Sequence, residues 1–108
     1  MKIINEKDVD VNKVPGEKGF INYQNLFKSE KIGITLTTIE PDSFAPKPVH
    51  SHKERQFNFI IEGEGTMVCG GREINVKVGE LIIFDSWEDH SFKAMGSRLK
   101  SVEIKLYE

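Results

Sequence analysis

The chain shows almost no helical periodicity, and this feature restricts its fold more than any other. Its apolar residues occur in short runs or alternate with polar residues, and Gly, Pro, Asp and Asn separate the runs. Many short segments of this kind, each with a period of two, are typical of a β-sandwich or β-barrel. The pattern predicts strands at residues 20–27, 31–40, 56–62, 66–69, 72–78, 81–84, 90–93 and 99–107.

Local signals refine this all-β prediction. Gly70-Gly71 predicts a tight hairpin turn with positive φ. Pro46 and Pro48 predict an extended, non-helical segment before His50. The run Leu-Ile-Ile-Phe at 81–84 is expected to be well buried. So many short strands need a closed or doubly layered sheet to protect their edges, so we expect a small barrel or jelly roll.

The bulk properties limit the class of protein. A length of 108 residues predicts one domain over residues 1–108, with residues 1–19 as an edge strand or an arm that pairs with a second subunit. The net charge of −2 gives no excess of positive charge for binding nucleic acid or anionic lipid. One cysteine cannot form an intrachain disulfide, and no apolar run is long enough for a membrane span. We expect a soluble cytoplasmic protein.

The three histidines of the chain form the main candidate for a functional site. His50 and His52 are two residues apart, so both project from the same side of an extended strand. Gln56 and His90 could complete the donor set around one metal ion. Glu54 competes with Gln56 for the fourth position, because a shift of register would present it instead. The alternative is that these side chains are ordinary polar residues of loops and turns.

The residues around the histidine pair resemble the first motif of the cupin family. That motif contains a Gly, then His-x-His, then a Glu, then a second Gly. His50, His52 and Gly63 stand at the matching positions. Gln56 replaces the Glu, and Phe44 replaces the leading Gly.

The second cupin motif matches in register but less completely. Gly79 and His90 agree with it, whereas Asp85, Trp87 and Ala94 stand at its Pro, Gly and Asn positions. Two half-matches in the correct order and spacing indicate a small single-domain cupin. The resemblance implies an all-β double-stranded β-helix, the jelly-roll barrel of that family. It does not imply one function, because a fold serves many chemistries.

The resemblance also implies that His50, His52, Gln56 and His90 bind one divalent metal. Three neutral nitrogens and one oxygen suit Fe, Mn, Ni, Cu or Zn, and the sequence does not choose among them. A neutral Gln leaves more positive charge at the metal than a Glu would, which favours Lewis-acid chemistry. Such a set resembles that of the cupins that linearise unsaturated uronate sugars and of some lyases.

We therefore expect a metal-dependent enzyme of isomerase or lyase type that acts on a sugar acid or an oxo or hydroxy acid. The alternatives are a metal-dependent dioxygenase and a non-catalytic cupin that binds or senses a small ligand. The expected partners are a small molecule and a second copy in a homodimer, with no nucleic acid and no membrane. The dimer rests on exposed strand edges and on the frequency of symmetric dimers.

Glu103 is the candidate catalytic proton carrier. In an extended strand it shares a face with Lys105, and Val102 and Ile104 form the other face. Burial preferences favour the apolar set inside, which would leave Glu103 as a solvated exterior charge. The expected pocket residues are Phe92, Phe59 and Met67.

Overall fold

The structure is a computed structural model that describes residues 1–50 and 52–107, and it describes side chains throughout these ranges except at residues 47–50. It contains one short 3-10 helix and ten strands. Their bounds are η1 Glu6–Asp8, β1 Asn12–Pro15, β2 Phe20–Lys28, β3 Ile32–Ile39, β4 Phe44–His50, β5 Arg55–Glu62, β6 Glu64–Cys69, β7 Arg72–Lys77, β8 Leu81–Phe84, β9 His90–Ala94 and β10 Leu99–Leu106. The prediction of an all-β fold is confirmed. Within the described ranges, no helix has the length and apolar character needed to cross a membrane.

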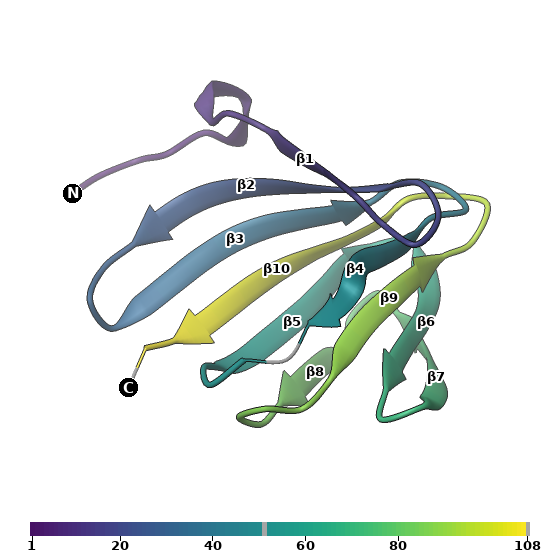
Figure 1. Ribbon diagram of the computed structural model, residues 1–108. Helices are drawn as coiled ribbons and strands as arrows, with labels where there is room; N and C mark the ends of the chain where they lie inside the picture. The colour runs from purple at the N-terminus through teal and green to yellow at the C-terminus, as the bar shows by residue number, and fades with distance from the viewer. Residues whose placement is uncertain (51, 108) are drawn as a thin grey trace.

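The strands form two antiparallel sheets (Figure 1). The larger sheet has the order β1-β2-β3-β10-β5-β8, and the smaller has the order β4-β9-β6-β7. Buried apolar side chains from both sheets meet between the two layers and form the core. The members of this core are Ile21, Ile39, Ala45, Ile60, Met67, Val76, Phe84, Phe92, Ala94 and Leu99.

β4 lies outside the predicted set of strands, and β1 lies within residues 1–19, where an edge strand was one of two expectations. Both are edge strands. β1 pairs only with β2, and β4 pairs with β9 in the smaller sheet. β4 contains Pro46 and Pro48, which lack an N–H for a ladder hydrogen bond. An edge position tolerates such residues, so the two prolines, which predicted an extended segment here, are compatible with a strand.

The turn predicted at Gly70-Gly71 is confirmed. Cys69 pairs with Arg72, so the two glycines form the whole connection between β6 and β7. Their φ values are 56° and 77°, which a side chain would strain.

The N-terminal segment is held against the chain's own large sheet. β1 pairs with β2, and η1 is tied to β2 by Gln24, whose Nε2 donates to the carbonyls of Glu6 at 2.7 Å and Val9 at 3.1 Å. Lys100 of β10 adds an ion pair with Glu6 at 3.2 Å. This segment therefore covers the outer face of the sheet at one end.

Over most of the width of the large sheet, polar side chains face the interior and apolar side chains face outward, the reverse of the usual arrangement. Gln56, Asn58 and Glu103 face inward and are buried, while apolar side chains on the same strands face outward. The expectation that residues 81–84 are well buried is wrong for this reason. Leu81 is 54% exposed and Ile83 is 50% exposed on the outer face, and Phe84 faces the core.

Candidate functional site

Two of the predicted metal ligands meet where the loop before β5 lies against the start of β9. The rings of His52 and His90 lie edge to face, with 4.9 Å between their centroids. The backbone of His50 pairs with that of His90 in the β4–β9 ladder. The side chain of His50 lies outside the described part of the chain, so its role as a ligand stays a prediction.

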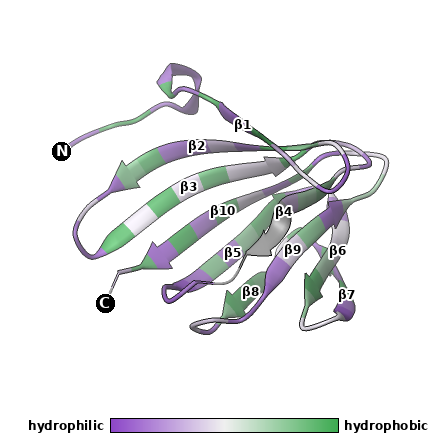
Figure 2. Ribbon diagram, in the orientation of Figure 1, coloured by the Kyte–Doolittle hydropathy of each residue, from purple (hydrophilic) through white to green (hydrophobic). Residues whose placement is uncertain are grey.

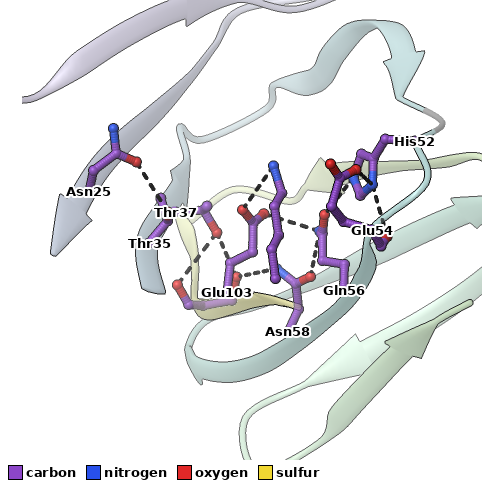
Figure 3. Close-up of polar contacts among 10 residues, drawn as sticks. Asn25, Thr35, Thr37, His52, Glu54, Gln56, Asn58 and Glu103 are labelled. Carbon is purple, nitrogen blue, oxygen red and sulfur yellow. Dashed lines mark hydrogen bonds and ion pairs between the residues drawn. The ribbon is translucent and has the colours of Figure 1, made fainter. Parts of the chain in front are cut away.

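The imidazole of His52 has an acceptor at each nitrogen. Its Nδ1 lies 2.9 Å from the carbonyl oxygen of Glu54, and its Nε2 lies 3.0 Å from Gln56 Oε1 (Figure 3). A carbonyl can only accept, so Nδ1 carries the proton that is donated to Glu54. In the neutral ring, Nε2 therefore presents a lone pair toward Gln56.

The amide of Gln56 is oriented by its other contacts. Its Nε2 donates to Asn58 Oδ1 at 2.8 Å and to Glu103 Oε1 at 3.1 Å, so its oxygen must face His52. The reverse orientation would place two acceptors against each other. Gln56 is 2% exposed, and water does not relax this constraint.

In the neutral ring with its proton on Nδ1, two lone pairs face each other across 3.0 Å, between His52 Nε2 and Gln56 Oε1. An imidazole nitrogen and an amide oxygen that converge with their lone pairs are donors of the kind that bind a divalent cation. The donor set therefore fits a divalent cation, which would replace the repulsion between the lone pairs by two bonds. The rival ligand Glu54 contacts His52 on the opposite side, with its carboxylate 3.5 Å from Nδ1.

His90 is oriented in the same way as His52. Its Nδ1 lies 3.0 Å from the carbonyl oxygen of Glu88, and its ring stacks on Phe84 with 4.7 Å between centroids. A backbone carbonyl that fixes the tautomer is the usual outer partner of a metal-binding histidine. Among the side chains that the structure describes, no three His, Cys, Asp or Glu residues form a metal cluster.

Glu103 points into the interior, and the expectation that it is a solvated exterior charge is wrong. It is 7% exposed, between Gln56 and Lys105, whose Nζ lies 3.8 Å from its carboxylate (Figure 3). Burial raises the pKa of this carboxyl, and the charges of Lys105 and His52 oppose that rise. The register of β10 explains this orientation. Glu103 shares a face of the strand with Ser101 and Leu99, and both of these residues are buried.

A chain of buried polar groups continues from Glu103 across the sheet. Asn58 Nδ2 donates to Ser101 Oγ at 3.0 Å, and that hydroxyl lies 2.6 Å from Thr37 Oγ1. None of these three residues was predicted as a site residue from the sequence. The sequence does have polar residues at every second position of β3, β5 and β10. This alternation alone does not show which face of the sheet is inside.

A pocket of about 370 Å³ opens beside Glu103 on the same inner face. Burial and the negative charge of Glu103 raise the pKa of Tyr23, which lines the pocket and stays protonated. The pocket lining is Asn12, Tyr23, Asn25, Thr35, Glu103 and Lys105. A hollow of about 480 Å³ lies on the smaller sheet instead, near Asn75 and Lys77, and it contains none of the predicted site residues.

The three expected pocket residues separate into two groups. Met67 and Phe92 belong to the buried core, and Phe92 lies edge to face with Phe84, which in turn stacks on His90. Phe59 is on the outer face of β5 and is 44% exposed, so the prediction that it lines the pocket is wrong. Its neighbours Asn58 and Ile60 face inward in its place.

Trp87 joins the two loops that carry the histidines. Its backbone N–H donates to the carbonyl of His52 at 2.7 Å. Its φ is 67°, the left-handed region that glycine adopts readily, and the cupin motif has Gly at this position. The side chain itself is 65% exposed.

The comparisons with known proteins identify the family. A family model described as "Cupin domain" matches residues 35–104, so the chain belongs to the cupins. No match was found among curated proteins.

Solved structures support the same fold at low sequence identity. A predicted oxalate decarboxylase from Thermotoga maritima is 21% identical with a TM-score of 0.86, over 97% of this chain and 98% of that chain. The polyketide cyclase RemF from Streptomyces resistomycificus is 22% identical with a TM-score of 0.84, over 100% and 80% of the two chains. KdgF from a Halomonas species is 12% identical with a TM-score of 0.82, over 99% and 95%.

Proposed function

We propose that this cupin is an enzyme that uses one divalent metal ion as a Lewis acid, in an isomerase- or lyase-type reaction on a sugar acid or an oxo or hydroxy acid. The observation that carries the proposal is the convergence of His52 Nε2 and Gln56 Oε1, which lie 3.0 Å apart, with the Gln56 amide oriented by buried hydrogen bonds. His90 and His50 complete the proposed ligand set. A bound ion would polarise an oxygen of the substrate and stabilise negative charge on it.

Glu103 is the proton carrier in this proposal. Burial raises the pKa of this carboxyl above its ordinary value, which is the direction that general acid catalysis requires. One carboxylate oxygen accepts from the Gln56 amide at 3.1 Å, and the other faces Lys105. The same side chain thus touches the proposed ligand set and the pocket.

The pocket favours an oxygen-rich anion. Lys105 offers a positive charge for a carboxylate, while Asn25 and Thr35 offer hydrogen bonds to hydroxyl groups. The hydroxyl of Tyr23, kept protonated, is a further donor. Two structural neighbours are named as a predicted oxalate decarboxylase and a polyketide cyclase, which supports an enzymatic role for a protein of this shape.

The first test is elemental analysis of protein purified without added metal or an affinity tag. We expect near-stoichiometric divalent metal in the wild type and none in the His50→Ala/His52→Ala double variant. Gln56→Ala should lower metal affinity, and Glu54→Ala, which keeps the carbonyl that orients His52, is the matched control that should not. An empty wild type that also refuses added metal would support the ligand-binding alternative.

The second test separates catalysis from binding. Glu103→Gln should retain metal and lose turnover of the sugar acid or hydroxy acid found by screening the metal-loaded wild type. Its amide oxygen can still accept from Gln56, so loss of turnover would reflect the missing proton. Redox-active metal together with oxygen consumption in the screen would instead favour the dioxygenase.

A further inference from the structure

The pocket beside Glu103 is built by the inner face of the large sheet. Figure 2 shows hydrophobic residues alternating with polar ones along β10, and the polar residues Glu103 and Lys105 share the face that lines the pocket. The register aligns Glu103 with Thr35 of β3, and Thr35 with Asn25 of β2. Side chains of three adjacent strands therefore surround one hollow of about 370 Å³, a volume typical of sites for small molecules.

Tyr23 lines this pocket with a hydroxyl that has no protein partner. The residue stands on β2 opposite Thr37, and its ring packs against the hydrophobic core. Among the side chains that the structure describes, none forms a hydrogen bond with the hydroxyl. Burial and the charge of Glu103 raise the pKa of Tyr23, so the hydroxyl keeps its proton and remains a donor. A tyrosine hydroxyl in such surroundings usually has a partner, and this one is available to a ligand.

Asn25 and Thr35 supply both kinds of hydrogen-bonding group on the same side of the pocket. Thr35 Oγ1 donates to Asn25 Oδ1 at 3.1 Å, so the amide oxygen is occupied and the NH₂ group is left to donate (Figure 3). The Thr35 oxygen still has lone pairs that can accept. Asn12, which pairs with Tyr23 in register, adds a second amide to the lining. A ligand hydroxyl both donates and accepts, so it matches this set better than a carboxylate, which only accepts.

The charged residues lie on the other side of the pocket, toward the proposed metal ligands. Lys105 pairs in register with Gln56, and Glu103 accepts from the Gln56 amide at 3.1 Å. Tyr23 and Asn25 are on β2, three strands away from β5. Neighbouring strands are about 4.8 Å apart, so about 14 Å separates the backbones of β2 and β5. A ligand that contacts both sides must therefore extend across the sheet past Glu103.

We infer that Tyr23 and Asn25 bind the hydroxyl groups of such an extended ligand, which makes a polyhydroxylated acid of about six carbons the substrate class. An extended chain advances roughly 1.2 Å per bond, so six carbons with an oxygen at each end span about 8 Å, and side chains from both strands cover the remaining distance. The inference rests on the proposed function, because it places the acid end at Lys105 and the metal ion. Tyr23 and Asn25 determine specificity and lie remote from the reacting atoms.

Amide NMR titrations of the zinc-loaded full chain with two acids test this inference. Gluconate and 2-hydroxyhexanoate share the 2-hydroxy acid head and the number of carbons, but only gluconate has hydroxyl groups along its tail. Gluconate should bind about tenfold more tightly. Tyr23→Phe and Asn25→Ala should each weaken the binding of gluconate about three- to tenfold and leave that of 2-hydroxyhexanoate unchanged.

Tyr107→Phe is the matched control variant. The Tyr107 hydroxyl lies against Gly33, and the residue is not part of the pocket lining. Its removal should change the affinity for neither acid. Because Asn25 is exposed, Asn25→Ala decides the test if Tyr23→Phe does not fold.

The same titrations in the presence of a chelator separate this inference from the proposed function. Gluconate should still shift the amide resonances of Tyr23, Asn25 and Thr35, and Tyr23→Phe should weaken that binding. A chain that takes up no zinc but shows these shifts would refute the metal proposal alone. Equal affinities for the two acids, equal losses of both acids in the variants, a matching loss in Tyr107→Phe, or no such shifts in either sample would overturn the inference.

Discussion

Replacing Gln56 by Glu would test the arrangement of the buried site most directly. Gln56 donates two hydrogen bonds, at 2.8 Å to Asn58 and 3.1 Å to Glu103, and all three residues are at most 7% exposed. The new carboxylate has no donor for either partner. A buried acceptor left without its donor costs about 1–3 kcal/mol, so losing both bonds would cost about 2–6 kcal/mol.

The protein can limit this loss by binding one proton between the two carboxyls. Protonating a carboxyl of ordinary pKa at pH 7 costs about 1.36 kcal/mol for each of roughly 2.7 pH units, or about 4 kcal/mol. We therefore expect Gln56→Glu to lower the free energy of unfolding of the metal-free protein by about 2–4 kcal/mol. For a domain of this size that corresponds to a fall in Tm of about 10–25 °C.

Thermal unfolding followed by circular dichroism in the presence of a chelator measures this loss. The added carboxyl has a raised pKa in the folded state, so its penalty is absent below about pH 4.3 and grows as the pH rises through the folded pKa. The swap Gln56→Glu/Glu103→Gln restores one donor and one acceptor and should recover about half of the loss. Gln24→Glu is the control, since Gln24 also donates to two acceptors but lies near the surface.

Two results would refute this reasoning. One is an unchanged Tm for Gln56→Glu in metal-free buffer. The other is a swap variant no more stable than Gln56→Glu alone, because the interaction between the two positions would then be absent.

Three further predictions concern stability. Glu103→Gln should stabilise the metal-free protein increasingly as pH rises above about 4.3, because burial raises the pKa of Glu103 and its ionised form is penalised; equal pH profiles in denaturant melts would contradict this. Trp87→Gly should be more stable than Trp87→Ala by about 1 kcal/mol, the reverse of the usual order, because φ is 67° there; melting both variants decides it. Phe84→Ala should cost about 3–5 kcal/mol, since Phe84 is 2% exposed and supports the ring of His90, and a urea midpoint close to that of the wild type would argue against the packing.

Much of the fold could be predicted from local sequence signals. The predicted strands match the observed ones to within two residues at each end, because alternation and turn residues act locally. The Gly70-Gly71 turn follows from the backbone angles that glycine permits. At β4 the prolines predicted only an extended segment, and its position at a sheet edge makes them compatible with a strand.

The orientation of the strand faces could not be predicted in the same way. For β10 the alternation defined two faces, and burial preferences assigned the apolar one to the interior. The structure has the opposite arrangement, with Glu103 inside and Val102 half-buried outside. Which face is inside depends on what the rest of the sheet covers, and that information is not local. The same error placed Phe59 in the pocket and Leu81 in the core.

The inward orientation of Glu103 gives a physical reason for the presence of Gln at residue 56. Compared with the Glu of the cupin motif, Gln56 removes one negative charge from the proposed metal site. The structure places the carboxylate of Glu103 directly behind the Gln56 amide, at 3.1 Å, so a negative charge remains within the buried network. Two adjacent buried carboxylates would repel, whereas an amide can present its oxygen to His52 and its N–H group to Glu103. An inward Glu103 therefore favours a donor at residue 56, and the charge of the proposed metal site depends on Glu103 as well as on Gln56.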